Sequence, residues 1–261
     1  TYMALSFHNK NRLKDVSIRW YQSGTYPLQS LNYTYNELIS AEKDALIFTD
    51  ANWTLFASYL LQYGKGLFND KKVIFSALML TPFSMNELTE ELGIPEFKDA
   101  DPEFYKSKTP TMTFANEMKK RIEHIAKYTK RPIYISVSTN EAVKNLLKDH
   151  LYGEGLLMRY SSKPYDNLAV MRRNFENTYL LDYLYETFYP ETLTDVCLDL
   201  KGVKMLSIYY VPAFKSLLQF YKESGDVTHY DKLYSLLESI VKKADYYSDE
   251  VRERYLKSIN F

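Results

Sequence analysis

The chain has 261 residues, of which 46% are hydrophobic and 25% are charged, a balance that can bury a core and disfavours a disordered chain. Its 33 basic and 33 acidic residues give a formal net charge of zero, so no overall field steers nucleic acid toward the surface. We therefore predict no nucleic-acid partner. The length fits one large domain or two ordinary ones.

Cysteine and histidine are too sparse for the common disulfide and metal frameworks. Cys197 is the only cysteine, and the four histidines are scattered without a metal-ligand spacing. We predict no metal site and no cofactor. No apolar run reaches the roughly 18 residues that cross a bilayer. The sequence starts without methionine and without a signal-peptide pattern, so we expect a leader or membrane segment upstream.

In chain order, helical and strand patterns alternate over the first 161 residues. Short, unalternating apolar runs are typical of buried parallel strands, whereas recurrence every three to four residues indicates a helix. The predicted order is helix 28–39, strand 45–49, helix 54–64, strand 72–80, helix 84–93, helix 114–129, strand 132–138, helix 140–150 and a candidate fourth strand 155–161. This order predicts an α/β fold with a three- to four-stranded, mainly parallel sheet layered by helices.

Local signals mark several helix ends. Gly64 suits the left-handed turn after the helix 54–64. Ser84 with Glu87, and Ser138 with Glu141, have the spacing of capping boxes that start helices. The prolines and mixed charges of residues 93–110 predict a long loop that either borders a site or is a plain surface excursion.

After Ser161 the pattern is helical to the end of the chain. We predict an α/β domain over residues 1–161 and a helical region over 162–261, either separate or packed with the first as one unit. Residues 213–243 are similar to one degenerate tetratricopeptide repeat (TPR) unit, with a turn at Gly225. One unit cannot form a solenoid, so we expect a closing helical hairpin, with peptide-groove binding as the alternative.

The 25 tyrosines admit two interpretations. Tyrosine combines a large apolar ring with a hydroxyl group, so it suits the seams between packed helices. The same rings on a surface would form an aromatic binding face for a carbohydrate or a protein.

Polar residues follow the first and third predicted strands. In open α/β sheets, ligands bind outside the carboxyl ends of the strands, which selects five candidate ligand-binding residues: Asp50, Asn52, Trp53, Ser138 and Asn140. They could hydrogen-bond a polar ligand and stack a ring. They lack a second acid and a nearby histidine, so we assign no catalytic residue. The same residue types cap helices, which is the competing interpretation.

A family resemblance rests on segments between Ser23 and Ser161. "SGTYPLQSLNYTYNELISAEKDALIFTDANWTLFASYLLQ", "KVIFSALML", "RPIYISVSTNE" and "HLYGEGLLMRYS" resemble the soluble C-terminal region of Bacteroidetes multi-pass membrane proteins described as protein O-mannosyltransferase-like. That family tends to carry two aspartates in its turn, whereas this chain has Asn52, Trp53 and Thr54 there, leaving Asp50 as the only acid. The resemblance implies that glycosyl transfer belongs to an upstream membrane region.

These observations lead to three functional hypotheses. The preferred one is a non-catalytic extracytoplasmic (periplasmic) domain that binds a protein partner or glycan and is anchored through an upstream membrane segment; a cytoplasmic location is the alternative. The second is an enzyme or small-ligand binder at the strand ends. The third is a TPR-like scaffold, which requires an exposed groove lined by Tyr221, Tyr230 and Tyr234.

Overall fold

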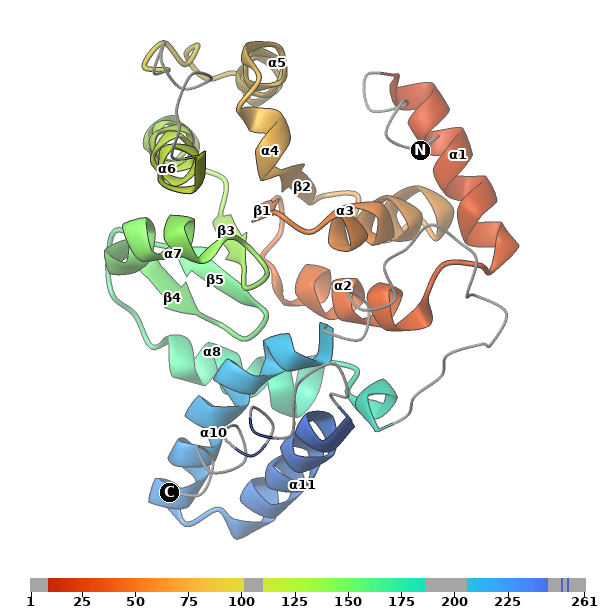
Figure 1. The fold of residues 1–261 in the computed structure, drawn as a ribbon, viewed down its shortest axis with the longest axis vertical. Helices are drawn as coiled ribbons and strands as arrows, with labels where there is room; N and C mark the ends of the chain where they lie inside the picture. The colour runs from red at the N-terminus through yellow and green to blue at the C-terminus, as the bar shows by residue number, and fades with distance from the viewer. Residues whose placement is uncertain (1–8, 101–109, 186–205, 244–249, 251–252, 254–261) are drawn as a thin grey trace.

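A computed structural model describes residues 9–100, 110–185 and 206–243, together with Glu250 and Glu253. Cys197, much of the predicted loop 93–110 and parts of the predicted C-terminal helices lie outside these residues. Two helices come first, α1 (Lys10–Ser23) and α2 (Leu28–Ser40), and α2 leads into the sheet (Figure 1).

Within the described ranges the sheet has five strands, one more than the upper limit of the prediction. They are β1 (Leu46–Thr49), β2 (Lys72–Phe75), β3 (Ile133–Ser136), β4 (Leu151–Gly153) and β5 (Leu157–Tyr160), in the order β2-β1-β3-β5-β4. β1 pairs in parallel with β2 and β3, whereas β5 is antiparallel to both β3 and β4. The sheet is therefore mixed, with a parallel half and an antiparallel hairpin at one edge.

Helices cover both faces of the sheet because alternate strand residues point to opposite sides. Leu46 and Phe48 pack against α5 (Pro82–Leu92), α6 (Pro110–Tyr128) and α7 (Glu141–Leu147). On the other face, Ile47 packs against α2 and α3 (Asn52–Tyr59). The α/β class predicted from the sequence is confirmed.

One strand prediction was wrong in extent, and one strand was missed. The apolar run 72–80 is strand only to Phe75 and continues as a short helix, α4 (Ser76–Met79). A continuous apolar run does not distinguish a buried strand from a buried helix. No strand was predicted before Gly155, but this segment contains β4, which pairs with β5 through a tight connection. Three-residue strands give too little periodicity to be detected.

The predicted helix starts were also displaced. Thr81, not Ser84, caps α5: its Oγ1 accepts the backbone N–H of Ser84 at 3.3 Å, and Pro82 follows. Asn140, not Ser138, caps α7 by accepting the N–H of Ala142 at 2.8 Å. Both true caps satisfy N–H groups of the first turn that lack partners within the helix.

Gly64 ends a π-helical turn, η2 (Leu60–Gly64), but it does not adopt the predicted left-handed conformation. A Cβ atom on Gly64 would lie 2.5 Å from Cβ of Tyr21 in α1. Glycine is required here because α1 packs closely on this backbone. The left-handed turn lies two residues later, at Gly66, whose φ is 76°.

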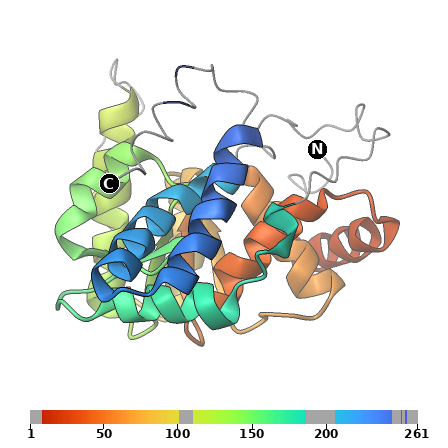
Figure 2. The same ribbon diagram turned by 90° about the horizontal axis from the view of Figure 1, so that it is seen from below.

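The C-terminal part is helical in the residues that the structure describes. It contains α8 (Asn167–Arg173), the π-turn η5 (Asn174–Thr178), the short 3₁₀ helices η6 (Asp182–Leu184) and η8 (Leu206–Tyr210), α10 (Val211–Ser224) and α11 (Val227–Lys243). α10 and α11 form an antiparallel hairpin around Gly225, seen side by side in Figure 2. Two consecutive helices were predicted here and are present, whereas their likeness to a TPR unit stays a prediction.

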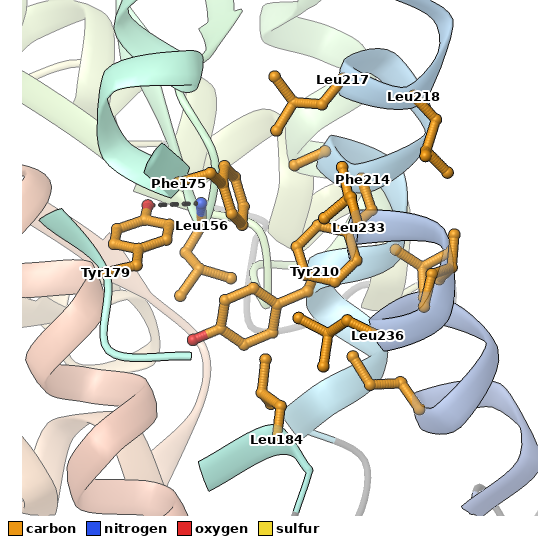
Figure 3. Packing of buried hydrophobic residues seen from close by; sticks show 14 of the residues in the cluster. Leu156, Phe175, Tyr179, Leu184, Tyr210, Phe214, Leu217, Leu218, Leu233 and Leu236 are labelled. Atoms are coloured by element: carbon orange, nitrogen blue, oxygen red, sulfur yellow. Dashed lines mark hydrogen bonds between the residues drawn. The ribbon is translucent and has the colours of Figure 1, made fainter. Parts of the chain in front are cut away.

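A tyrosine-rich core joins this hairpin to the α/β part. Tyr210 and Phe214 pack with Phe175 and Tyr179 in one buried cluster (Figure 3), and Tyr33 of α2 belongs to the same cluster. Asn36 of α2 binds the backbone of Leu180 through both amide atoms, at 2.8 and 2.9 Å, and donates to the hydroxyl of Tyr210 at 2.8 Å. These tyrosines line the seam between helices, as the first interpretation expected.

Candidate functional site

The carboxyl ends of β1 and β3 bring three of the five predicted site residues close together. Oδ2 of Asp50 accepts the backbone N–H of Asn140 at 2.7 Å, and Ser138 Oγ lies 3.3 Å from Oγ1 of Thr49. β1 connects to β2 over one face of the sheet and β2 connects to β3 over the other. The crevice between β1 and β3 is therefore the topological switch point, where open α/β sheets bind ligands.

Hydrogen bonds within the chain use several of the polar groups at this crevice, although Oδ1 of Asp50 is buried without a partner. The Asp50 carboxylate takes the N–H of Asn140 at the start of α7, which is the position where a ligand anion would bind. Thr139 Oγ1 donates to the carbonyl of Phe48 at 3.3 Å, tying the two strand ends together. Of the five predicted residues only Asn140 caps a helix, so the helix-starting interpretation holds for Asn140, whereas Asp50 ties the two strand ends together.

Asn52 and Trp53 make no hydrogen bond to the crevice residues Asp50, Ser138 and Asn140 in the described structure. Asn52 is the exposed first residue of α3, and it does not cap that helix. Trp53 packs against the tyrosine-rich core, and its carbonyl accepts the Tyr26 hydroxyl at 2.7 Å. The indole N–H of Trp53 is buried and has no hydrogen-bond partner. The ligand-binding role of the five residues stays a prediction.

A chain of hydroxyl groups leads inward from Ser138 to a buried carboxyl group that the sequence analysis missed. Ser138 Oγ lies 2.8 Å from Ser136 Oγ, which in turn donates to Oε1 of Glu37 at 2.5 Å. Glu37 and Ser136 are fully buried. A ligand in the solvent cannot reach Glu37 unless α2 moves.

Burial raises the pKa of Glu37 to about 8, while the hydroxyls of Ser136, Thr54 and Tyr33 act in the opposite direction. The Thr54 and Tyr33 hydroxyls and Oε2 of Glu37 make no well-aligned hydrogen bond. Burial disfavours the charged form of a carboxyl group that lacks a cationic partner. Glu37 is therefore protonated at neutral pH. Its burial could have been suspected from the sequence, because Glu37 lies on the same helical face as Tyr33.

A second site lies in the C-terminal part. A pocket of about 240 Å³, here named the His229 pocket, lies between η5, η6 and the ends of α10 and α11. Its polar lining residues are Glu176, Asp182, His229 and Lys232, and Tyr221 forms part of its wall. Leu180 and Tyr185, which also line it, are 51% and 42% exposed.

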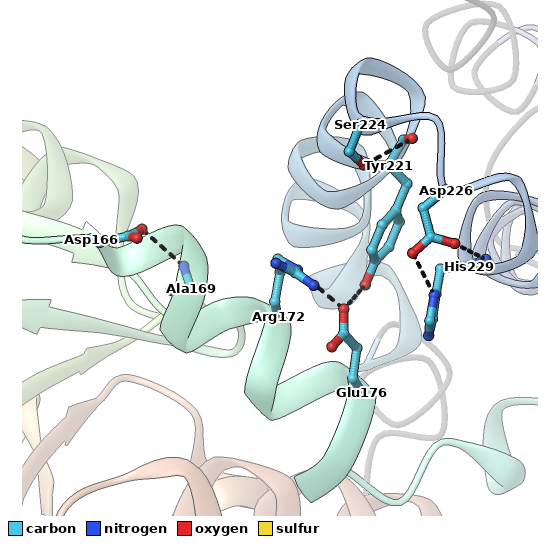
Figure 4. A network of polar contacts seen from close by, with 8 residues as sticks. All are labelled: Asp166, Ala169, Arg172, Glu176, Tyr221, Ser224, Asp226 and His229. Atoms are coloured by element: carbon cyan, nitrogen blue, oxygen red, sulfur yellow. Dashed lines mark hydrogen bonds and ion pairs between the residues drawn. The ribbon is translucent and has the colours of Figure 1, made fainter.

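Hydrogen bonds fix the polar groups of this pocket (Figure 4). Oε1 of Glu176 accepts from the Tyr221 hydroxyl at 2.7 Å and from Nε of Arg172 at 3.2 Å. Asp226 accepts the backbone N–H of His229 at 3.1 Å, and its second oxygen lies 2.8 Å from Nδ1 of the ring. The His229 ring stacks on Tyr221 with centroids 5.3 Å apart.

The electrostatics of the pocket follow from these contacts. Burial, with the Glu176 carboxylate beside the hydroxyl, raises the pKa of Tyr221 well above its usual value. Hydrogen bonds from the backbone and side chain of His229 lower the pKa of Asp226. The pocket therefore presents carboxylates and aromatic rings rather than an activated nucleophile. Among the described residues no group of three or more His, Cys, Asp or Glu side chains could hold a metal ion.

The His229 pocket could not be found from the sequence. Glu176 and Tyr221 are 45 positions apart, and neither belongs to a recognisable motif. Over the described ranges, no helix combines the length and the apolar character that a membrane span requires. Comparisons with protein-family models, with curated proteins and with solved structures found no significant match.

Proposed function

We propose that this chain is a non-catalytic binding domain that takes a glycan in the His229 pocket. The observation that carries the proposal is the combination of a fixed carboxylate, Glu176, with ring faces in one concave site. Sugar hydroxyls bind to carboxylate oxygens, here those of Glu176 and Asp182, and the apolar face of a sugar packs on aromatic rings, here His229 and Tyr185. The pocket's volume of about 240 Å³ is below the roughly 300 to 1,000 Å³ of sites for drug-sized ligands, so it suits a single sugar ring rather than a long oligosaccharide.

Binding is a better account than catalysis for two reasons. At the strand-end crevice Oδ2 of Asp50 is taken by the N–H of Asn140, and Glu37 behind it is inaccessible to solvent. In the His229 pocket, Tyr221 donates to Glu176, so the hydroxyl is held as a hydrogen-bond donor and its raised pKa disfavours ionisation. Neither site combines an accessible nucleophile with an oriented base.

The proposal includes a location. The resemblance to the soluble part of Bacteroidetes O-mannosyltransferase-like membrane proteins favours an extracytoplasmic domain attached through an upstream membrane segment. A full-length gene product without upstream hydrophobic spans would remove this part of the proposal and leave the binding site untouched. The alternative of a TPR-like peptide groove gains little support, because Tyr221 is only 2% exposed and belongs to the core.

The test is a glycan-binding screen by saturation-transfer NMR, with affinities then measured for wild type and two variants. His229→Ala removes the exposed ring and should weaken binding at least fivefold. Thr228→Ala is the matched control, because Thr228 is exposed on the same helical turn and does not line the pocket. Absence of any binding sugar, or equal loss in both variants, would overturn the proposal.

A further inference from the structure

A separate groove of about 660 Å³ lies between α7 and α10, away from the His229 pocket. Figure 1 shows the β4–β5 hairpin between these two helices. The groove is lined by apolar side chains from the strands and from η8, including Leu151, Met158 and Ile208. Each of these three is partly exposed, so the apolar lining faces solvent.

The rim of the groove carries more positive than negative charge. Lys144 and Lys148 lie on the α7 side and Lys215 on the α10 side, whereas among the described residues Glu141 is the one acidic side chain of the lining. Lys144 Nζ donates to the carbonyl of Val137 at 2.9 Å, which fixes the ammonium group at the groove. The same ammonium group holds Oε2 of Glu141 at 2.8 Å, although the Glu141 side chain is 74% exposed.

This ion pair shows how a carboxylate is held at the groove. The Lys144 side chain is only 18% exposed, so its ammonium group keeps a hydrogen-bond acceptor at the groove, whereas the Glu141 carboxylate stays largely in water. A ligand carboxylate can therefore take the place of Glu141 on Lys144 while Glu141 returns to solvent. A ligand with an apolar body gains in addition by covering Met158 and Ile208, which removes apolar surface from water.

We infer that the groove between α7 and α10 binds an amphipathic organic carboxylate, with its head at Lys144 and Lys148 and its aliphatic body along the apolar lining. The volume is within the range of small-molecule sites, roughly 300 to 1,000 Å³. The charge of the rim selects an anion, and the lining selects an aliphatic chain over a sugar or a free phosphate. This inference does not depend on the His229 pocket.

The first arm of the test separates head from body with three probes. Octanoate, octanol and acetate are titrated into the protein while the ε-methyl resonances of methionine are followed by NMR. Octanoate should shift the Met158 methyl resonance and bind at least fivefold more tightly than octanol or acetate. Equal binding of octanoate and octanol, or an unmoved Met158 resonance, would overturn the inference.

The second arm uses two lysine variants. Lys148→Gln removes an exposed charge of the rim and should weaken octanoate binding threefold or more. Lys130→Gln is the control, because Lys130 is equally exposed but lies before β3, at the opposite end of the strand from Val137. Octanoate affinity that falls equally in both variants would show a non-specific charge effect and would refute the site.

Discussion

Glu37 is a buried carboxyl group without a cationic partner among the described residues, and this fixes the sign of its pH dependence. Its folded pKa of about 8 is above the ordinary value of 4.5. Between these values the native state binds more protons than the unfolded state, so the contribution of Glu37 to stability is greatest below pH 4.5 and is lost as the pH rises to about 8. Glu37→Gln should remove this dependence, because glutamine is neutral and retains an acceptor for Ser136.

The measurement is urea unfolding of both proteins from pH 5 to pH 8. At pH 8, Glu37→Gln should be more stable than wild type by about 2 to 4 kcal/mol, and at pH 5 the two should agree within about 1 kcal/mol. Glu117 is the contrasting case: burial acts to raise its pKa, but hydrogen bonds and charges from Lys120 and Arg121 prevail and lower it. If the free energies of unfolding of Glu37→Gln and wild type changed in parallel with pH, Glu37 would have the same pKa in the folded and unfolded states, which would contradict the prediction.

Gly155 is a position where only glycine fits. Its φ is 126°, and a Cβ atom there would lie 2.5 Å from the hydroxyl of Tyr179. That hydroxyl accepts the N–H of Leu156 at 3.1 Å, so it cannot move without losing a buried bond. Gly155→Ala should destabilise the protein by at least about 2 kcal/mol in urea unfolding.

Gly24→Ala is the matched control for Gly155→Ala. Gly24 also has a positive φ, 65°, but no atom lies within 4 Å of its added Cβ. Gly24→Ala should therefore lower the free energy of unfolding by only about 1 kcal/mol, which is the cost of a positive φ for alanine without any steric contact. Equal losses for the two variants would mean that contact with Tyr179 contributes nothing.

Helix starts show how neighbouring residues of similar chemistry compete for one role. Thr81 precedes Pro82, whose fixed φ and missing N–H suit the first helical position, so the cap falls on Thr81 rather than on Ser84. Thr81→Ala should reduce the free energy of unfolding by about 0.5 to 2 kcal/mol, whereas Ser84→Ala should change it by less than about 0.5 kcal/mol. Thermal unfolding of the two variants measures the difference. A larger loss of stability for Ser84→Ala would favour the predicted capping box at Ser84 and Glu87 over the cap at Thr81.

The complete fold shares one tyrosine-rich core between the α/β part and the C-terminal hairpin. Asn36 alone makes three hydrogen bonds across this boundary. We therefore expect the chain to unfold in one transition. Trp20 packs on Tyr26 and Phe56 in the α/β part, so its fluorescence in a Trp53→Phe background reports that part, whereas far-ultraviolet circular dichroism reports every helix. Coincident urea curves from the two signals are expected, and a separate second transition in circular dichroism would place a domain boundary near residue 161.

The order and type of most elements could be predicted because they depend on local periodicity. The stripe of Met118, Ile122 and Ile125 indicated α6, and all three are buried against the sheet. The parallel pairing of β1 with its neighbours followed from the alternation of helix and strand. The edge hairpin of β4 and β5 did not, because strand direction there depends on a tight turn inside a short, glycine-containing segment.

The sequence by itself determined the α/β class, the apolar faces of the helices and the absence of a strong net charge, since each is a property of composition or of residues a few positions apart. Only the tertiary structure decided that Asp50 closes the crevice with Asn140, 90 positions away, and that Glu37 meets Ser136, 99 positions away. Contacts at such separations are set by how the layers pack. No local pattern encodes them, and the His229 pocket and the lysine-rimmed groove share that origin.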